Sequence, residues 1–128
     1  MEETRDSGVG AATVVQMPGA VVLQLHGNID RTATDALTTA YERGVAEQSG
    51  DGGRARVVLD FTDADYINSS GIAIVVSVLA RARGEGRAVA ATGLTEHYRH
   101  IFDITRLSDF MEVCPDLDTA VGSSIGSY

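Results

Sequence analysis

Apolar residues near the start of the chain form two short runs separated by a proline–glycine pair. The runs Thr13–Met17 and Ala20–Leu25 are rich in β-branched side chains, which favours strands. Pro18-Gly19 leaves room only for a short turn between them. The pattern therefore predicts an antiparallel hairpin at the beginning of the domain.

After the hairpin the apolar spacing becomes helical. The segment Asp30 to Thr34 offers several N-cap candidates, and apolar positions then recur every three or four residues up to about Gln48. A glycine-rich break at 49–53 ends this helix, and the β-branched run 55–61 is typical of a buried central strand. The next segment, 62–70, is expected to be a loop.

A strongly apolar stretch, 71–80, begins the second predicted helix, which ends near Gly84. At about 100° per residue, the side expected to face the sheet consists of Ile72, Val75, Val76 and Leu79. Ile74 and Val78 are expected on the outer side, continuous with the preceding loop. We hypothesise that they form a docking patch; the alternative is that neighbouring helices cover them.

The last third of the chain alternates again. It predicts a strand at 88–91, a helix from the cap Thr95 to about Phe102, a strand at 110–113 and a helical turn at 116–121. This order predicts an α/β fold with a mixed β-sheet of four to five strands and about four α-helices packed against it.

The sequence predicts a single domain over residues 11–121. A polar lead, 1–10, and a small-residue tail, 122–128, show no periodicity and are expected to be flexible. The most apolar stretch is too short to span a bilayer, which takes about 20 residues. We therefore expect a cytoplasmic protein without membrane insertion.

Charge and composition exclude several functions. The net charge is -8 and every basic residue is an arginine, so direct nucleic-acid binding, a Walker-type phosphate loop and a Schiff base are not expected. Cys114 is the only cysteine, so no disulfide can form within the chain. His97 and His100 lack an evident third ligand, and no cofactor or metal is predicted.

The segment from Asp65 to Ile72 carries the candidate chemistry. It places Ser69, Ser70 and Gly71 where a buried strand gives way to an apolar helix. The first-turn amides of a helix have no intrahelical partners, so a serine hydroxyl could cap them and a phosphate there would be partly stabilised. Read alone, the serines are most simply helix caps, and so is Asp30.

The motif Asp65-Tyr66-Ile67-Asn68-Ser69-Ser70-Gly71 resembles the signature of STAS domains, the anti-sigma factor antagonists of bacteria. The resemblance covers most of the chain. Gly27-Asn28-Ile29-Asp30 is similar to the family's turn before its first helix, and 57–61 to its central strand. Residues 94–107 are similar to its third helix and the following turn.

The resemblance implies a partner switch. In this family the serine matching Ser69 is phosphorylated by an anti-sigma factor that is also a serine kinase. The unphosphorylated form binds this partner and releases the sigma factor, whereas the phosphorylated form cannot. Together with the docking hypothesis, this gives the expected partner-binding residues as Asp30, Asn68, Ser69, Ser70, Gly71, Ile74 and Val78. The protein is expected to be a monomer or weak homodimer.

One residue departs from the family pattern. Asn68 stands where the family usually has aspartate, and an amide can neither act as a base nor carry charge. This favours the alternative of a STAS scaffold or transport-complex subunit that works without phosphorylation. An enzyme is disfavoured, because Ser69 has no Gly-x-Ser-x-Gly elbow and no triad order is recognisable.

Overall fold

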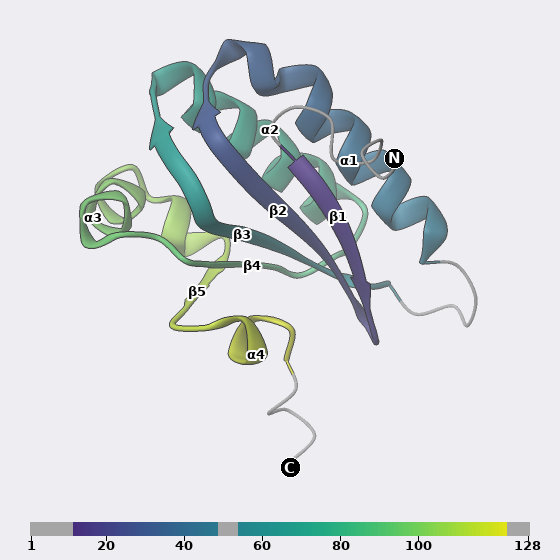
Figure 1. Ribbon diagram of the computed structural model, residues 1–128. Helices are drawn as coiled ribbons and strands as arrows, with labels where there is room; N and C mark the ends of the chain where they lie inside the picture. The colour runs from purple at the N-terminus through teal and green to yellow at the C-terminus, as the bar shows by residue number, and fades with distance from the viewer. Residues whose placement is uncertain (1–11, 49–53, 123–128) are drawn as a thin grey trace.

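The computed structural model describes residues 12–48 and 54–122 (Figure 1). The predicted lead 1–10, the glycine-rich break 49–53 and all of the predicted tail except Gly122 lie outside these residues. The elements are β1 (Ala12–Met17), β2 (Ala20–Ile29), the 3-10 turn η2 (Arg31–Ala33), α1 (Thr34–Glu47), β3 (Arg56–Ile67), α2 (Ser69–Gly84), β4 (Val89–Thr92), α3 (Glu96–Ile104), the 3-10 turn η3 (Leu107–Asp109), β5 (Glu112–Cys114) and α4 (Leu117–Ala120).

The strands form one mixed sheet in the order in which they occur along the chain, β1-β2-β3-β4-β5. β1 and β2 form the predicted antiparallel hairpin, and every later neighbour pairs in parallel. Parallel neighbours require crossover connections, which α1, α2 and α3 provide. The prediction of an α/β fold with a five-strand mixed sheet and four α-helices is confirmed.

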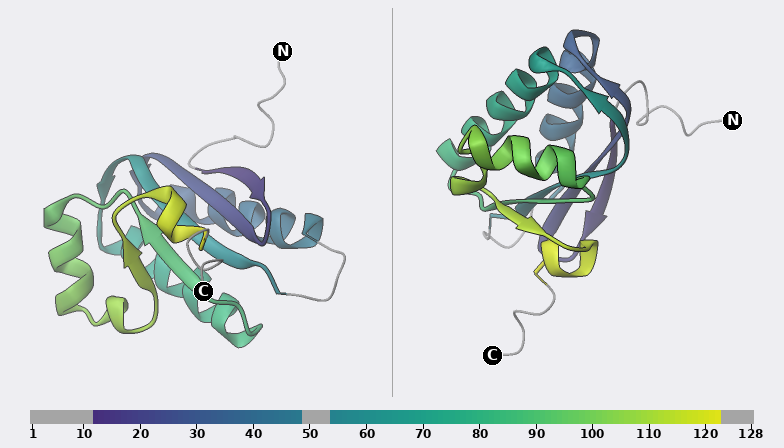
Figure 2. Two further views of the ribbon diagram at one scale, coloured as in Figure 1. Left: turned by 90° about the horizontal axis from the view of Figure 1, so that it is seen from below. Right: turned by 90° about the vertical axis from the view of Figure 1, so that its left-hand side faces the viewer.

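The two faces of the sheet are covered unequally (Figures 1 and 2). Helices α1, α2 and α3 lie over one face, where the larger core collects alternate strand residues such as Leu23 and Leu59. The short helix α4 packs against β4 and β5 on the other face, where Ala120 joins a smaller core with Val22 and Val58. Among the described residues, no helix is long and apolar enough to cross a bilayer.

Helix α2 is rotated relative to the expectation from its sequence. Ile74 and Val78 are only 8% and 5% exposed, so they belong to the core and do not form an exposed patch. Val76, expected to face the sheet, is 41% exposed. The buried stripe is Gly71, Ile74, Val75, Val78, Leu79 and Ala82. The prediction was wrong because α1 lies beside α2, so a second arc of the helix is buried in addition to the sheet-facing one.

The segment expected to be a loop after the central strand is mostly strand. β3 continues to Ile67 because the long strand β2 runs beside it to Ile29. Two register shifts in this pairing, one of them next to Gly27 with a φ of +67°, let the strands continue past polar residues. Asp63 lies in this extension, 3.6 Å from the Nδ1 atom of His26. The extension carries the chain directly to the start of α2.

The end of the chain follows the predicted order with shifted boundaries. Thr95 caps α3 as expected, its hydroxyl accepting a hydrogen bond from the Tyr98 amide at 3.2 Å. The last strand begins at Glu112, two residues later than the start of the predicted run. Phe110 instead ends the 3-10 turn η3, and it remains 49% exposed.

Candidate partner-binding site

The candidate site lies at the carboxyl edge of the two longest parallel strands. The register pairs Ile29 of β2 with Ile67 of β3, so Asp30 and Asn68 each follow the last pair. The Asn68 amide also donates to the Ile29 carbonyl at 3.3 Å. Two sequence segments that the resemblance singled out are therefore brought together. The carboxyl ends of parallel strands are where α/β domains commonly bind their ligands.

Asn68, not a serine, caps α2. Its backbone is extended, its Oδ1 atom accepts from the Gly71 amide at 2.9 Å, and its carbonyl accepts from the Ile72 amide at 2.9 Å. Neither Ser69 nor Ser70 donates or accepts a side-chain hydrogen bond within the described residues. The expectation that a serine hydroxyl caps the helix was wrong, because the preceding amide side chain occupies the cap.

Both serine side chains are exposed in the first turn of α2. Ser69 therefore lies on the surface of the protein. The first-turn amides of α2 lie beside it. A phosphate on this residue would therefore be placed on the surface, where it would change the charge that a partner meets.

Gly71 fixes the distance between the two segments of the site. A β-carbon at this position would lie 1.8 Å from the Ile29 carbonyl oxygen and 3.0 Å from the Ile67 side chain. Only a hydrogen atom fits there, so the first turn of α2 rests directly on the end of β2. The role of this glycine is close approach of two backbone segments.

Asp30 is a cap, as predicted from the sequence. Its Oδ1 atom accepts from the Thr32 hydroxyl at 2.5 Å and from the Thr32 amide at 2.9 Å. The hydroxyl hydrogen bond, and then the amide one, hold the pKa of this carboxyl below its ordinary value. Asp30 is therefore an ionised carboxylate at the same edge as the exposed serines.

A third helix steadies this edge from the opposite side. The Ile67 amide donates to the hydroxyl of Tyr98 in α3 at 2.9 Å. Tyr98 itself packs against the main core. The last residue of β3 is therefore held by β2 on one side and by α3 on the other.

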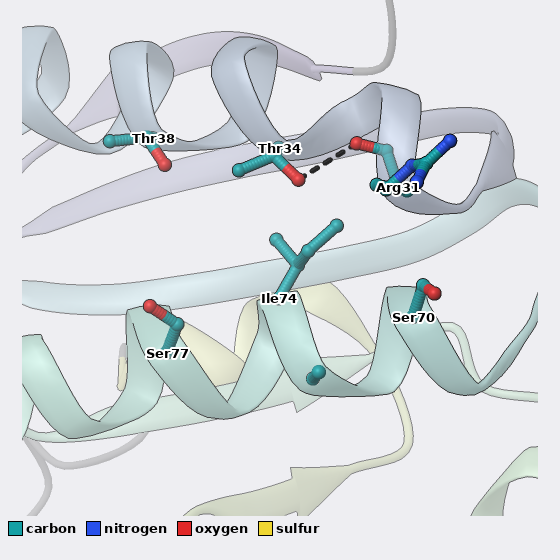
Figure 3. A pocket seen from close by; sticks show the side chains of 7 residues that line it. Arg31, Thr34, Thr38, Ser70, Ile74 and Ser77 are labelled. Atoms are coloured by element: carbon teal, nitrogen blue, oxygen red, sulfur yellow. Dashed lines mark hydrogen bonds between the residues drawn. The ribbon is translucent and has the colours of Figure 1, made fainter.

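A groove of about 310 Å³ between α1 and α2 opens beside Ser70 (Figure 3). Arg31 and Ser70 lie at one end, Thr38 and Ser77 lie at the other, and Ile74 lies between them. Ile74 is thus part of this surface as a buried floor. Sequence reasoning missed Arg31, although Ser70, Ile74 and Ser77 follow one another at helical spacing.

Other candidate chemistry does not assemble near the site. No group of three histidine, cysteine or acidic side chains that could hold a metal occurs in the part of the chain that the structure describes. The Asp60 carboxylate accepts hydrogen bonds from the Thr62 amide at 3.0 Å and from the Thr62 hydroxyl at 2.6 Å. Burial raises the pKa of the Cys114 thiol, which argues against a reactive thiolate there.

These features define an α/β domain whose second helix presents an exposed serine pair at the carboxyl edge of a mixed sheet. The comparisons with known proteins name its family. Residues 12–114 match the family described as "Mlab, STAS domain", and the chain belongs to the STAS domain family. It is 30% identical over 103 residues to BtrV of Bordetella bronchiseptica, which is named as an anti-sigma factor antagonist. That match covers 80% of this chain and 82% of BtrV.

Solved structures share the fold at low identity. The anti-sigma factor antagonist SpoIIAA in its unphosphorylated form is 13% identical, with a TM-score of 0.67 over 92% of this chain and 100% of SpoIIAA. SpoIIAA of Bacillus in the phosphorylated form is 16% identical, with a TM-score of 0.65 over 89% and 99%. A sulfate transporter family protein from Wolinella succinogenes is 11% identical, with a TM-score of 0.67 over 87% and 88%.

Proposed function

We propose that this chain is an anti-sigma factor antagonist that binds an anti-sigma factor with serine-kinase activity through the face around Ser69. Phosphorylation of Ser69 by that partner would end the complex and so control sigma-factor-dependent transcription. The 30% identity to BtrV and the match to the STAS family support this function. On this proposal the protein is a cytoplasmic binding protein, not an enzyme, and it contacts no nucleic acid directly.

The observation that carries the proposal is the exposed Ser69 hydroxyl. Since Asn68 caps the helix, the helix does not need this hydroxyl for its own stability. A kinase can therefore modify it without breaking a hydrogen bond among the described residues. Asp30 lies at the same edge and is already ionised.

The switch follows from charge. A phosphate adds about -1.5 to -2 charges to the contact surface and must be desolvated when a partner covers it. It would also add to the negative charge of the edge that carries the Asp30 carboxylate, on a chain of net charge -8. A loss of about 3 kcal/mol weakens binding roughly a hundredfold, which is enough for a switch.

The test is phosphorylation by purified candidate partners. Each histidine-kinase-like ATPase of the source organism is incubated with this protein and ATP, followed by mass spectrometry and titration calorimetry. We expect one kinase to bind the unmodified chain and to phosphorylate wild type and Ser108→Ala, a serine of η3 outside the groove lining, but not Ser69→Ala. Binding should weaken about a hundredfold after modification. If no such kinase binds, the proposed function is wrong.

A second candidate function is a STAS scaffold or transport-complex subunit that is never phosphorylated. Asn68 favours it, because no carboxylate stands beside Ser69 in the sequence to orient it in a kinase. The description of the matching family and the sulfate transporter neighbour are compatible with it.

The two functions are separated by Asn68→Asp. An aspartate can cap the helix as asparagine does, so the fold should be unaffected. If wild type binds its partner and only Asn68→Asp accepts phosphate, the binding function holds and the switch is lost in this chain. Equal phosphorylation of both proteins would remove the reason for the second candidate.

A further inference from the structure

We propose that the groove between α1 and α2 receives an apolar side chain of the anti-sigma factor, with a neighbouring carboxylate of that partner bound to Arg31 and Ser70. This inference rests on the proposed function and adds a second contact to the Ser69 face. The groove begins at Ser70, the residue after the proposed phosphorylation site (Figure 3). A partner covering Ser69 therefore reaches the groove without leaving the surface.

The polar groups of the groove are available to a partner. The Arg31 guanidinium is exposed and makes no hydrogen bond or ion pair with another described residue. The same holds for the hydroxyls of Ser70, Thr38 and Ser77. By contrast, the Thr34 hydroxyl is already used, since it donates to the Arg31 carbonyl at 2.8 Å. One cation and several hydroxyl donors thus face the groove without a hydrogen bond or ion pair to another described residue.

The charge of the groove selects an acidic partner group. Among the described residues no carboxylate lines it, although the chain as a whole carries a net charge of -8. The nearest acid in sequence, Asp30, attracts Arg31 through space but forms no ion pair with it among the described residues, and its Oδ1 atom accepts hydrogen bonds from the amide and hydroxyl of Thr32. Arginine binds carboxylates in a forked geometry, and a serine hydroxyl beside it can donate to the same group. An acidic side chain is therefore the complementary occupant of this end.

The middle of the groove selects an apolar group. Ile74 forms the floor between the arginine end and the hydroxyl end. Ala73 also lines the groove. A volume of about 310 Å³ lies at the lower limit of ligand pockets, so it suits a side chain rather than a large cofactor. An apolar residue next to an aspartate or glutamate in the partner would fill the apolar floor and place a carboxylate at the arginine end.

Charge reversal tests the arginine contact. The affinity of Arg31→Glu for the kinase that binds wild type is measured by titration calorimetry, with Arg43→Glu as the control. Arg43 is another exposed arginine after the same 3-10 turn, in α1, without a described partner, and its reversal changes the net charge equally. We expect at least tenfold weaker binding for Arg31→Glu and less than twofold for Arg43→Glu. The difference should shrink in high salt.

Filling the groove tests the apolar contact. Ser77 is exposed, so Ser77→Phe should fold with the wild-type melting temperature while it occupies the floor beside Ile74. We expect at least tenfold weaker binding that persists in high salt. In the same assay Ser69→Asp reports on the proposed function.

The outcomes are distinct. If Ser69→Asp weakens binding while Arg31→Glu and Ser77→Phe bind as wild type does, the groove proposal is overturned and the proposed function stands. If no kinase binds wild type, both fail. Sedimentation of the protein alone checks for a second copy in the groove: dimerisation that Ser77→Phe abolishes would also overturn the proposal.

Discussion

At the scale of single residues, the site depends on two positions that no hydrophobic pattern marks. Asn68 takes the cap and leaves the serines exposed, and Gly71 lets the helix start touch β2. The sequence showed that a helix begins near these residues. It could not show which side chain caps it, because asparagine and serine are about equally good caps.

Replacement of Gly71 by alanine should destabilise the fold severely. The new methyl group would lie 1.8 Å from the Ile29 carbonyl oxygen, and neither backbone segment can retreat without losing its hydrogen bonds. We expect the free energy of unfolding in urea to fall by about 3 kcal/mol or more.

Gly84→Ala is the matched control. Gly84 lies in the same helix and is exposed, and a methyl group there would extend into open space, with no described neighbour within 4 Å. The free energy of unfolding of this variant should stay unchanged or rise by up to about 1 kcal/mol. Equal stability of the two variants would contradict the close-approach role of Gly71.

At the scale of elements, α2 shows that the buried face of a strongly apolar helix is hard to predict from its sequence. Because Ile72 and Val76 are as apolar as the buried positions, the sequence pattern permits more than one choice of inner face. The contact with α1 determines which residues of α2 are buried, and that contact cannot be predicted from the sequence of α2 alone. By comparison α1, whose outer face is polar, buries Leu37, Ala40 and Tyr41 at the helical spacing that its sequence shows.

Aspartate substitutions in α2 distinguish the two orientations. Ile74→Asp would bury a charge without a partner and should lower the free energy of unfolding by about 4 kcal/mol or more. Val76→Asp places the same charge at a 41% exposed position and should cost less than about 1 kcal/mol. Thermal unfolding followed by circular dichroism measures both. A stable Ile74→Asp protein would restore the orientation expected from the sequence.

At the scale of the whole molecule, the sequence predicted the class of fold and its mixed sheet, because the strand–helix alternation records them directly. It did not predict how helices far apart in the sequence are tied together. The Tyr41 hydroxyl of α1 donates to the Glu85 carboxylate after α2 at 2.5 Å. Arg81 and Arg87 contact the same carboxylate, at 3.4 Å and 3.3 Å.

The buried Tyr41 hydroxyl, hydrogen-bonded to Glu85, makes the stability of the fold decrease at alkaline pH. Burial, with help from the Glu85 hydrogen bond, raises the pKa of Tyr41 to about 12, above the ordinary value of 10.0 that an unfolded chain would show. The folded state therefore holds this proton more tightly. The resulting stabilisation is complete below pH 10 and is lost as the pH rises toward 12. It amounts to something on the order of 2 kcal/mol.

Urea unfolding at several pH values between about 8 and 12 measures the effect. Wild type should lose stability over this range by more than Tyr41→Phe, which has no proton to lose at that position. Since other groups titrate in both proteins, the difference between them isolates Tyr41. Parallel losses in the two proteins would show that the tyrosine does not titrate with a raised pKa.

The contact between Gly71 and the end of β2 also bears on how quickly the protein can be recognised. Asp30 and Ser69 sit on backbone segments that are already fixed against each other, so the proposed partner would meet both at a constant spacing. Binding then requires no loop to become ordered first, and little conformational entropy is lost on this side of the complex. Such a rigid surface would suit the repeated, rapid exchange of partners that the proposed switch requires.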